Sequence, residues 1–179
     1  MLEGYKGFSK GLINAYGMKF ELYKDYKVDI SEKILEYGVD GYGFHFAKRL
    51  EDCLRYYNGL DEEIEIAQVI ALGEVLESYD DYYGYYDLYV TDHIYIEHVL
   101  TREEILNYII GVNNFRVVRF IQGYKLTPLE ITEILRKYPN DNRIIDAIKY
   151  YQYHDDTAYV KRYRQRWCYG WYKYSSTNL

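Results

Sequence analysis

The sequence predicts an α+β fold, with a small, mainly antiparallel sheet and a central helix followed by a C-terminal all-helical, repeat-like region. Two observations predict it. Apolar residues alternate with a period of two in short segments before residue 100, and from Leu100 onward they recur with the period of a helix. The helical part also repeats itself. We therefore expect two domains, residues 1–100 and residues 101–179, with the second packed on the first.

The N-terminal strands surround one central strand that runs into a helix. Residues 5–9 and 18–23 have strand patterns and are expected to pair antiparallel. Phe44 and Phe46 alternate around His45 in the central strand, so His45 faces away from both rings. Residues 50–57 carry apolar side chains with the spacing of an amphipathic helix.

The rest of the sheet is expected from residues 63–99. Residues 63–75 alternate and then become apolar, which predicts a buried strand. Residues 79–89 are rich in tyrosine and aspartate and predict a loop or hairpin tip that turns at Gly84. Residues 93–99 alternate again and are expected to form the strand that closes the sheet.

Two similar helix starts mark the repeat. Thr101 and Thr127 are each followed three residues later by a glutamate, Glu104 and Glu130, which is the pattern of a capping box. Pro128 stands at the first helical position, which proline prefers. Short helices that repeat in this way are expected to stack like a small solenoid. Because the repeat has so few copies, its apolar faces are expected to be buried partly against the sheet.

The composition indicates the cellular compartment and the class of protein. Tyrosine accounts for 26 of 179 residues, far more than a core needs, and its ring suits surfaces that are part buried and part wet. Cys53 and Cys168 are distant in sequence, and no signal peptide or long apolar run is present. These features predict a cytoplasmic protein with free thiols and no membrane partner.

The net charge of −6 is distributed unevenly. Residues 56–101 contain no Lys or Arg but eleven Asp and Glu, so the rest of the chain has a net charge of +5. One surface is therefore expected to be strongly negative.

The acidic, tyrosine-rich tip is the strongest functional signal. A loop of this size has too little core to bury six tyrosines, and tyrosine supplies rigid contact area at interfaces. A basic protein surface is the natural complement of the aspartates, whereas phosphates would be repelled. A solvated hairpin is the alternative. The predicted partner-binding residues are Tyr79, Asp80, Asp81, Tyr82, Tyr83, Tyr85, Tyr86, Asp87 and Tyr89.

The C-terminal tail has the opposite character, because aromatic residues four apart form one helical stripe among Lys and Arg. Such a segment could bind RNA by stacking and charge. The favoured alternative is that the stripe seals the end of the helical array. The candidate RNA-binding residues are Arg162, Arg164, Arg166, Trp167 and Trp171.

No motif specifies a reaction, a metal or a cofactor. His45 is the best candidate for a catalytic group, as a general base or nucleotide contact, but a structural histidine between sheet and helix is favoured. His93 and Glu97 share a strand face, yet a zinc ion would need a third ligand. We therefore favour a non-enzymatic protein without a cofactor.

Six short motifs in residues 4–104 resemble an uncharacterised family of phage and prophage proteins of unknown function. They are Gly4-Tyr5-Lys6-Gly7-Phe8, Gly43-Phe44-His45-Phe46, Tyr56-Tyr57, Ala71-Leu72-Gly73-Glu74, Val90-Thr91-Asp92-His93-Ile94 and Leu100-Thr101-Arg102-Glu103-Glu104. The resemblance implies an origin in a mobile element.

The order of strands and helix also resembles the skeleton of ADP-ribosyltransferases. Those enzymes need an Arg or His on the first strand, where this chain has Tyr5-Lys6-Gly7, and a late catalytic glutamate that has no counterpart here.

Together these observations predict a phage-type accessory protein that binds and inhibits a host protein through the acidic tip, in the host cytoplasm. The concrete form is inhibition of a nucleic-acid-handling defence enzyme, as an anti-CRISPR protein does. Two alternatives remain open: a divergent ADP-ribosyltransferase-like or RNA-acting enzyme that uses His45, and an RNA-binding module that uses the tail.

Overall fold

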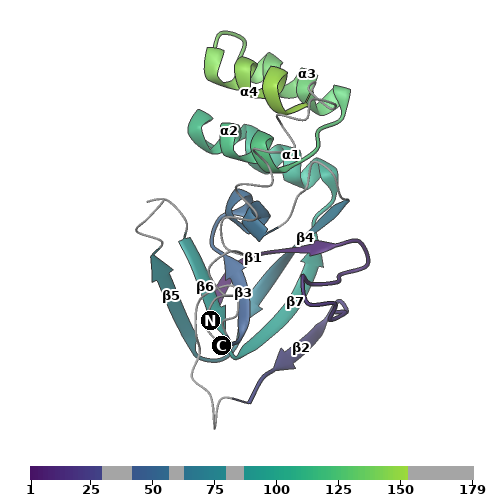
Figure 1. The fold of residues 1–179 in the computed structure, drawn as a ribbon, viewed down its shortest axis with the longest axis vertical. Coiled ribbons are helices and arrows are strands. Elements are labelled where there is room, and N and C mark those ends of the chain that lie inside the picture. Colours follow the sequence, from purple (N-terminus) through teal and green to yellow (C-terminus); the bar gives the residue numbers. More distant parts are fainter. Residues whose placement is uncertain (30–41, 57–62, 80–86, 153–179) are drawn as a thin grey trace, which may run out of the picture. The chain divides into compact units, whose positions relative to one another are not determined.

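The computed structural model describes residues 1–29, 42–56, 63–79 and 87–152 (Figure 1). They divide into two compact units, of which the first extends to Ile105 and the second begins at Leu106. The first unit contains an antiparallel sheet and the second is helical, which confirms the predicted α+β fold. The expected packing of one domain on the other stays a prediction.

Among the described residues, seven strands form one sheet in the order β2-β7-β4-β1-β3-β6-β5, and every pair is antiparallel. The strands are β1 (Leu2–Ser9), β2 (Lys24–Lys27), β3 (Phe44–Ala47), β4 (Ile64–Ala71), β5 (Val75–Tyr79), β6 (Asp87–Thr91) and β7 (His93–Val99).

One long bent hairpin organises this sheet. Strand β4 continues into β5 after three residues and β6 continues into β7 after one, while β4 pairs with β7 and β5 with β6. Strand β1 flanks the hairpin beside β4, and β3 flanks it beside β6. The pair Tyr5↔Ala47 joins these two flanks, so the sheet must curl round instead of lying flat. Figure 1 shows β4/β7 and β5/β6 diverging from the bend.

The bend is fixed by a contact that only glycine permits. A Cβ atom on Gly73 would lie 2.0 Å from Oδ1 of Asp92. That same oxygen accepts a hydrogen bond of 2.7 Å from the backbone N–H of Glu74, and the Asp92 carbonyl accepts another from Val28. Asp92 is buried, so its hydrogen bonds satisfy a charge that would otherwise be costly to bury.

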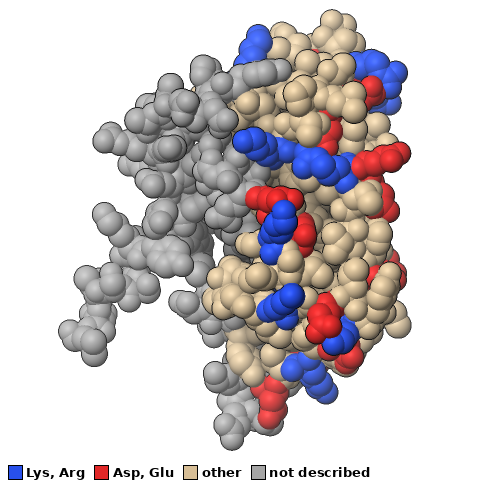
Figure 2. Space-filling view, turned by 90° about the vertical axis from the view of Figure 1, so that its right-hand side faces the viewer, with Lys and Arg blue, Asp and Glu red and all other residues tan. Residues whose placement is uncertain are grey.

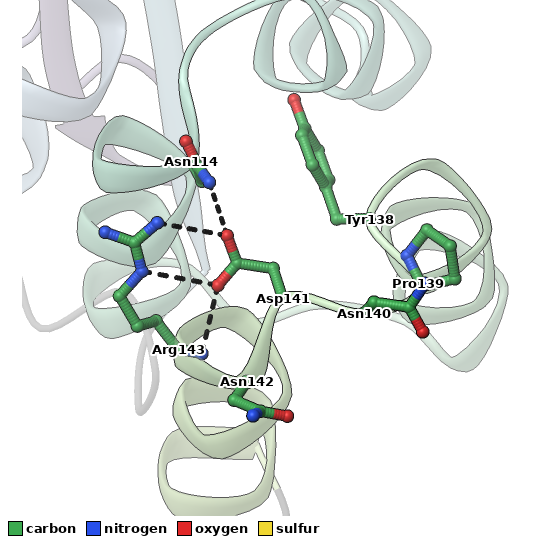
Figure 3. A pocket seen from close by; sticks show the side chains of 7 residues that line it. All are labelled: Asn114, Tyr138, Pro139, Asn140, Asp141, Asn142 and Arg143. Carbon is green, nitrogen blue, oxygen red and sulfur yellow. Dashed lines mark hydrogen bonds and ion pairs between the residues drawn. The ribbon is translucent and has the colours of Figure 1, made fainter.

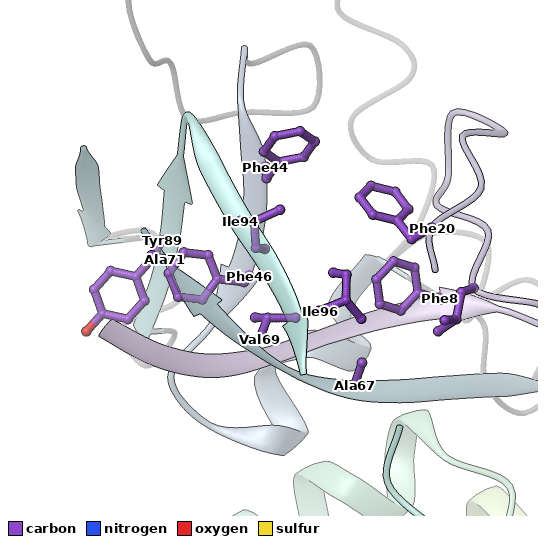
Figure 4. Packing of buried hydrophobic residues seen from close by; sticks show 11 residues of the cluster. Phe8, Phe20, Phe44, Phe46, Ala67, Val69, Ala71, Tyr89, Ile94 and Ile96 are labelled. Carbon is purple, nitrogen blue, oxygen red and sulfur yellow. The ribbon is translucent and has the colours of Figure 1, made fainter. Parts of the chain in front are cut away.

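Aromatic rings dominate the core of the first unit (Figure 4). The Phe20 ring centroid lies 5.3 Å from that of Phe8 and 6.0 Å from that of Phe44, although Phe20 belongs to no strand. Phe44 and Phe46 point to the same side, as their alternation predicted. The buried cluster comprises Phe8, Leu12, Phe20, Phe44, Phe46, Ala67, Val69, Ala71, Tyr89, Ile94 and Ile96.

The predicted pairing of the first two strands is wrong. Residues 18–23 form no strand, and Lys19 makes only an isolated bridge to Ile13. Phe20 is nevertheless buried, so its pattern reflects a loop anchored on the core. Tyr23 has a φ of 61°, which interrupts extended backbone before β2 begins.

Strand β7 does not close the sheet, contrary to expectation. It lies between β2 and β4, and the outermost strands of the described sheet are β2 and β5. Alternation alone identified β7 as a strand but carried no information about its neighbours.

The predicted central helix is present, as the 3₁₀ helix η1 (Leu50–Tyr56). Leu50, Cys53 and Leu54 are buried as predicted, because a spacing of three to four residues suits both kinds of helix. η1 packs against β1 and β3.

Residues 102–152 are mainly helical. Both predicted capping boxes are confirmed: Thr101 and Glu104 exchange bonds of 2.7 and 3.2 Å, and Thr127 and Glu130 exchange bonds of 2.6 and 3.3 Å. The helices are α1 (Arg102–Ile110), α2 (Asn114–Gly123), α3 (Pro128–Lys137) and α4 (Asn142–Gln152).

Side-chain hydrogen bonds connect the second helical hairpin, α3 and α4, to the first, α1 and α2. The Tyr138 hydroxyl, after α3, donates to the carbonyls of Ile110, the last residue of α1, and Val112, just after it. The Gln152 amide, at the end of α4, donates to the carbonyls of Ile121 and Tyr124, at the end of α2. The bonded residues are mostly 26 to 28 positions apart, so equivalent parts of the repeat lie together.

Candidate partner-binding site

The predicted tip is carried by a true hairpin. Strands β5 and β6 pair antiparallel, and their last registered pair is Tyr79↔Asp87. The turn expected at Gly84 and six of the predicted residues lie outside the described part of the chain: Asp80, Asp81, Tyr82, Tyr83, Tyr85 and Tyr86.

Tyr89 is a core residue, which corrects its place among the predicted surface residues. Its side chain is 5% exposed and its ring stacks on Phe46 with centroids 5.3 Å apart. Its hydroxyl donates a hydrogen bond of 3.2 Å to Glu77. A buried ring cannot supply contact area to a partner, so the binding surface must be sought elsewhere on the hairpin.

The outer strand of the hairpin exposes apolar side chains. Leu72, Val75 and Leu76 are 43%, 38% and 41% exposed, and Glu74 and Glu77 beside them are exposed as well. These five residues are called the β5 edge. Among the described residues β5 pairs with β6 alone. The sequence did not predict this surface, because apolar residues in a strand look alike whether the strand is central or outermost.

The expected negative surface stays a prediction, because several acids of the run, including Asp61, Glu62, Asp80 and Asp81, lie outside the described residues. Glu63 pairs with Lys10 at 2.9 Å, and the carboxylate of Glu65 accepts hydrogen bonds from the backbone of Gly11 and Leu12. Asp92, as described above, is buried at the bend. Figure 2 shows a face of the molecule on which acidic and basic residues are interspersed. Among the described acids of the run, Glu63, Glu74 and Glu77 are exposed.

Lys6, His45 and Cys53 belong to β1, β3 and η1, which pack together, and a structural role of His45 stays a prediction. The Lys6 ammonium donates a 2.6 Å hydrogen bond to the backbone carbonyl of His45. Burial lowers the pKa of Lys6 to about 8. It also raises the pKa of the Cys53 thiol, and the nearby Asp52 raises it further, which makes this thiol a poor nucleophile. Lys6 thus supports the junction of β1 and β3, where only one residue pair is in register.

The other two described histidines contact carboxylates. His93 lies 2.6 Å from Asp25 and links β7 to β2, while His98 lies 3.0 Å from Glu104 and links β7 to the start of α1. Within the described ranges, no group of three or more His, Cys, Asp or Glu side chains could hold a metal ion.

A pocket in the helical unit is lined by residues of the α4 capping network (Figure 3). The Asp141 carboxylate accepts bonds from the Asn114 amide, the Arg143 guanidinium and two backbone N–H groups of α4. The bond from Asn114, followed by that from Arg143, lowers the pKa of Asp141 to about 2. The helix start thus already holds an anion. The lining residues are Asn114, Tyr138, Pro139, Asn140, Asp141, Asn142 and Arg143.

The candidate RNA-binding residues of the tail, from Arg162 to Trp171, lie outside the described residues. None of the described helices is long and apolar enough to cross a membrane.

Fold and site together define an α+β protein built on a curled antiparallel sheet with a partly apolar, acidic outer strand. The chain belongs to the family described as a domain of unknown function (DUF7666), whose model matches residues 2–102. No curated protein and no solved structure matches the chain. The matched residues cover the sheet and reach only the first residue of α1, so most of the helical unit lies beyond the match.

Proposed function

We propose that this protein is a non-enzymatic binding module that holds a basic partner protein against the acidic hairpin formed by β5, β6 and the residues between them. In its concrete form, the module is a phage-type accessory protein that inhibits a host enzyme acting on nucleic acid, in the host cytoplasm.

The observation that carries this proposal is the composition of the β5 edge. It exposes Leu72, Val75 and Leu76 together with two glutamates, and residues 56–101 contain no Lys or Arg to neutralise them. Exposed apolar residues rimmed by charge are typical of interaction sites. A surface that binds nucleic-acid phosphates presents Lys and Arg, and a host protein that handles nucleic acid therefore offers the complementary charge.

Other described polar groups support a binding role by having structural duties. Lys6 contacts a backbone carbonyl, Cys53 is buried, and the carboxylates of Asp92 and Asp141 cap a bend and a helix.

The test begins with capture from host lysate at low and moderate salt. A basic protein that is retained less well at moderate salt is the expected result. Co-purifying RNA would favour the tail as the site, and an NAD-dependent modification would favour the enzyme alternative.

Binding kinetics with the purified partner then assign the surface. Tyr83→Ala is expected to raise the dissociation rate and to weaken binding by about 2 kcal/mol, as aromatic hot spots do. Asp80→Asn with Asp81→Asn should instead slow association, and the effect should fade with salt. Glu103→Gln, which removes one negative charge from the exposed surface of α1, is the control and should change neither rate. Unchanged kinetics in all hairpin variants would refute the proposal.

A further inference from the structure

We propose that the β5 edge binds its partner by strand addition, pairing with an extended segment that places Lys or Arg beside Glu74 and Glu77 and apolar residues beside Val75 and Leu76. This inference rests on the proposed function and specifies how the partner is held.

The position of β5 supplies the backbone groups for such pairing. It is the outermost strand of the described sheet, with β6 on one side and no described strand on the other. An outermost strand presents a row of N–H and C=O groups that can pair with another chain. Its five residues, Val75–Tyr79, are an ordinary length for a strand, and an exposed sheet edge can bind an extended peptide by strand addition.

The side chains of the edge specify the sequence of the added segment. Side chains of neighbouring strands stand beside each other on the same face of a sheet. Val75 and Glu77 lie on one face, paired with Thr91 and Tyr89, and Leu76 lies on the other. The run Glu74-Val75-Leu76-Glu77 is therefore matched by a basic residue, two apolar residues and a second basic residue. This pattern is the same in both directions.

A second copy of this chain is a poor occupant. Two β5 strands paired antiparallel about the centre of this run would place Glu74 beside Glu77 of the other copy, twice. Like charges directly opposite each other destabilise a sheet. Nucleic acid is repelled by the same glutamates. A basic, extended protein segment satisfies both the charges and the apolar side chains.

The probe is a fluorescent peptide, acetyl-Thr-Lys-Val-Val-Lys-Thr-amide, titrated with the full chain in an anisotropy assay. Alternate backbone amides of an extended peptide point to opposite sides, so only one set of amides can face β5. Two control peptides therefore carry N-methyl groups, one peptide on the first set of alternate amides and the other peptide on the second set. We expect the parent peptide to bind, one methylated peptide to bind at least about tenfold more weakly and the other to bind nearly as well. Hydrogen exchange of β5 amides should slow when the parent peptide is bound.

Protein variants separate pairing from charge. Glu74→Gln with Glu77→Gln should weaken binding of the parent peptide, whereas Glu103→Gln should leave its affinity unchanged. If both methylated peptides bind as the parent does while the glutamine variants still weaken binding, the hairpin binds by charge alone. That result refutes strand addition and leaves the proposed function standing. Failure of the parent peptide to bind also refutes strand addition, and the proposed function is then judged by the partner kinetics of the hairpin variants.

Discussion

Replacing Gly73 by alanine tests whether one contact sets the bend of the long hairpin. The new methyl group would lie 2.0 Å from Oδ1 of Asp92 and 2.9 Å from Cβ of His93, far inside normal contact distances. Asp92 is 5% exposed, so its carboxylate cannot move out into water without opening the bend.

The expected cost follows from the two ways of relieving this clash. Overpacking a buried site costs about 1–3 kcal/mol. Moving the carboxylate away would also break its bond to the Glu74 N–H, and a hydrogen bond to a charged group contributes about 1.5–3 kcal/mol. The two costs add, so we expect Gly73→Ala to lower the free energy of unfolding by about 2.5–6 kcal/mol. Gly111→Ala is the control, because its Cβ would meet nothing nearer than 3.4 Å.

The assay is urea unfolding followed by far-UV circular dichroism. Hydrogen exchange of β4 to β7 localises the effect, since a chain of two units need not unfold in one step. The same substitution is then made in an Asp92→Ala background, where the closest contact is gone. If Gly73→Ala changes stability by less than about 0.5 kcal/mol, or costs the same in both backgrounds, the contact does not set the bend.

Three further predictions concern other parts of the chain. Tyr138→Phe removes the hydroxyl that donates to the carbonyls of Ile110 and Val112, and should lower the free energy of unfolding in urea by about 1–2 kcal/mol. An unchanged free energy would mean that these hydrogen bonds do not stabilise the helical unit. His45→Gln should lower the melting temperature modestly and leave partner binding intact, and a well-folded variant without activity would support the enzyme alternative. The pKa of Glu104 is lowered from 4.5 to about 2, chiefly by the bond from the Thr101 N–H, so the stabilisation by this carboxylate is complete above pH 4.5 and is lost as the pH falls toward 2. Glu104→Gln should therefore flatten the stability profile over that range, and an unchanged profile would contradict the assignment.

Local patterns predicted local structure well. The alternation of residues 93–99 and the two Thr-x-x-Glu sequences each identified an element that the structure contains, because each depends on neighbours within a few residues. Phe20 and Leu22 misled the prediction, since a loop anchored on a core can show the same alternation as a strand. Strand order, which made β5 an outermost strand, depends on contacts between distant residues that no local pattern contains.

The motifs behind the family resemblance fall at structural junctions. A Cβ on Gly4 would lie 2.5 Å from the Ala47 carbonyl at the junction of β1 and β3, and Gly73 and Asp92 form the bend. Glu104 caps α1. These residues therefore explain the shape of the sheet unit, and Leu72 and Glu74, in the same motif as Gly73, also belong to the β5 edge.

The hydrogen bonds between the two helical hairpins have a consequence for the length of such a chain. Tyr138 bonds to the carbonyls of Ile110 and Val112, and Gln152 bonds to that of Tyr124, at separations of 26 to 28 residues. Each of these hydrogen bonds joins a side chain of the later hairpin to a backbone carbonyl of the earlier one. The contact therefore depends little on which side chains the earlier hairpin carries. A helical unit built in this way can be lengthened or shortened by whole hairpins, and its natural increment of length is one repeat.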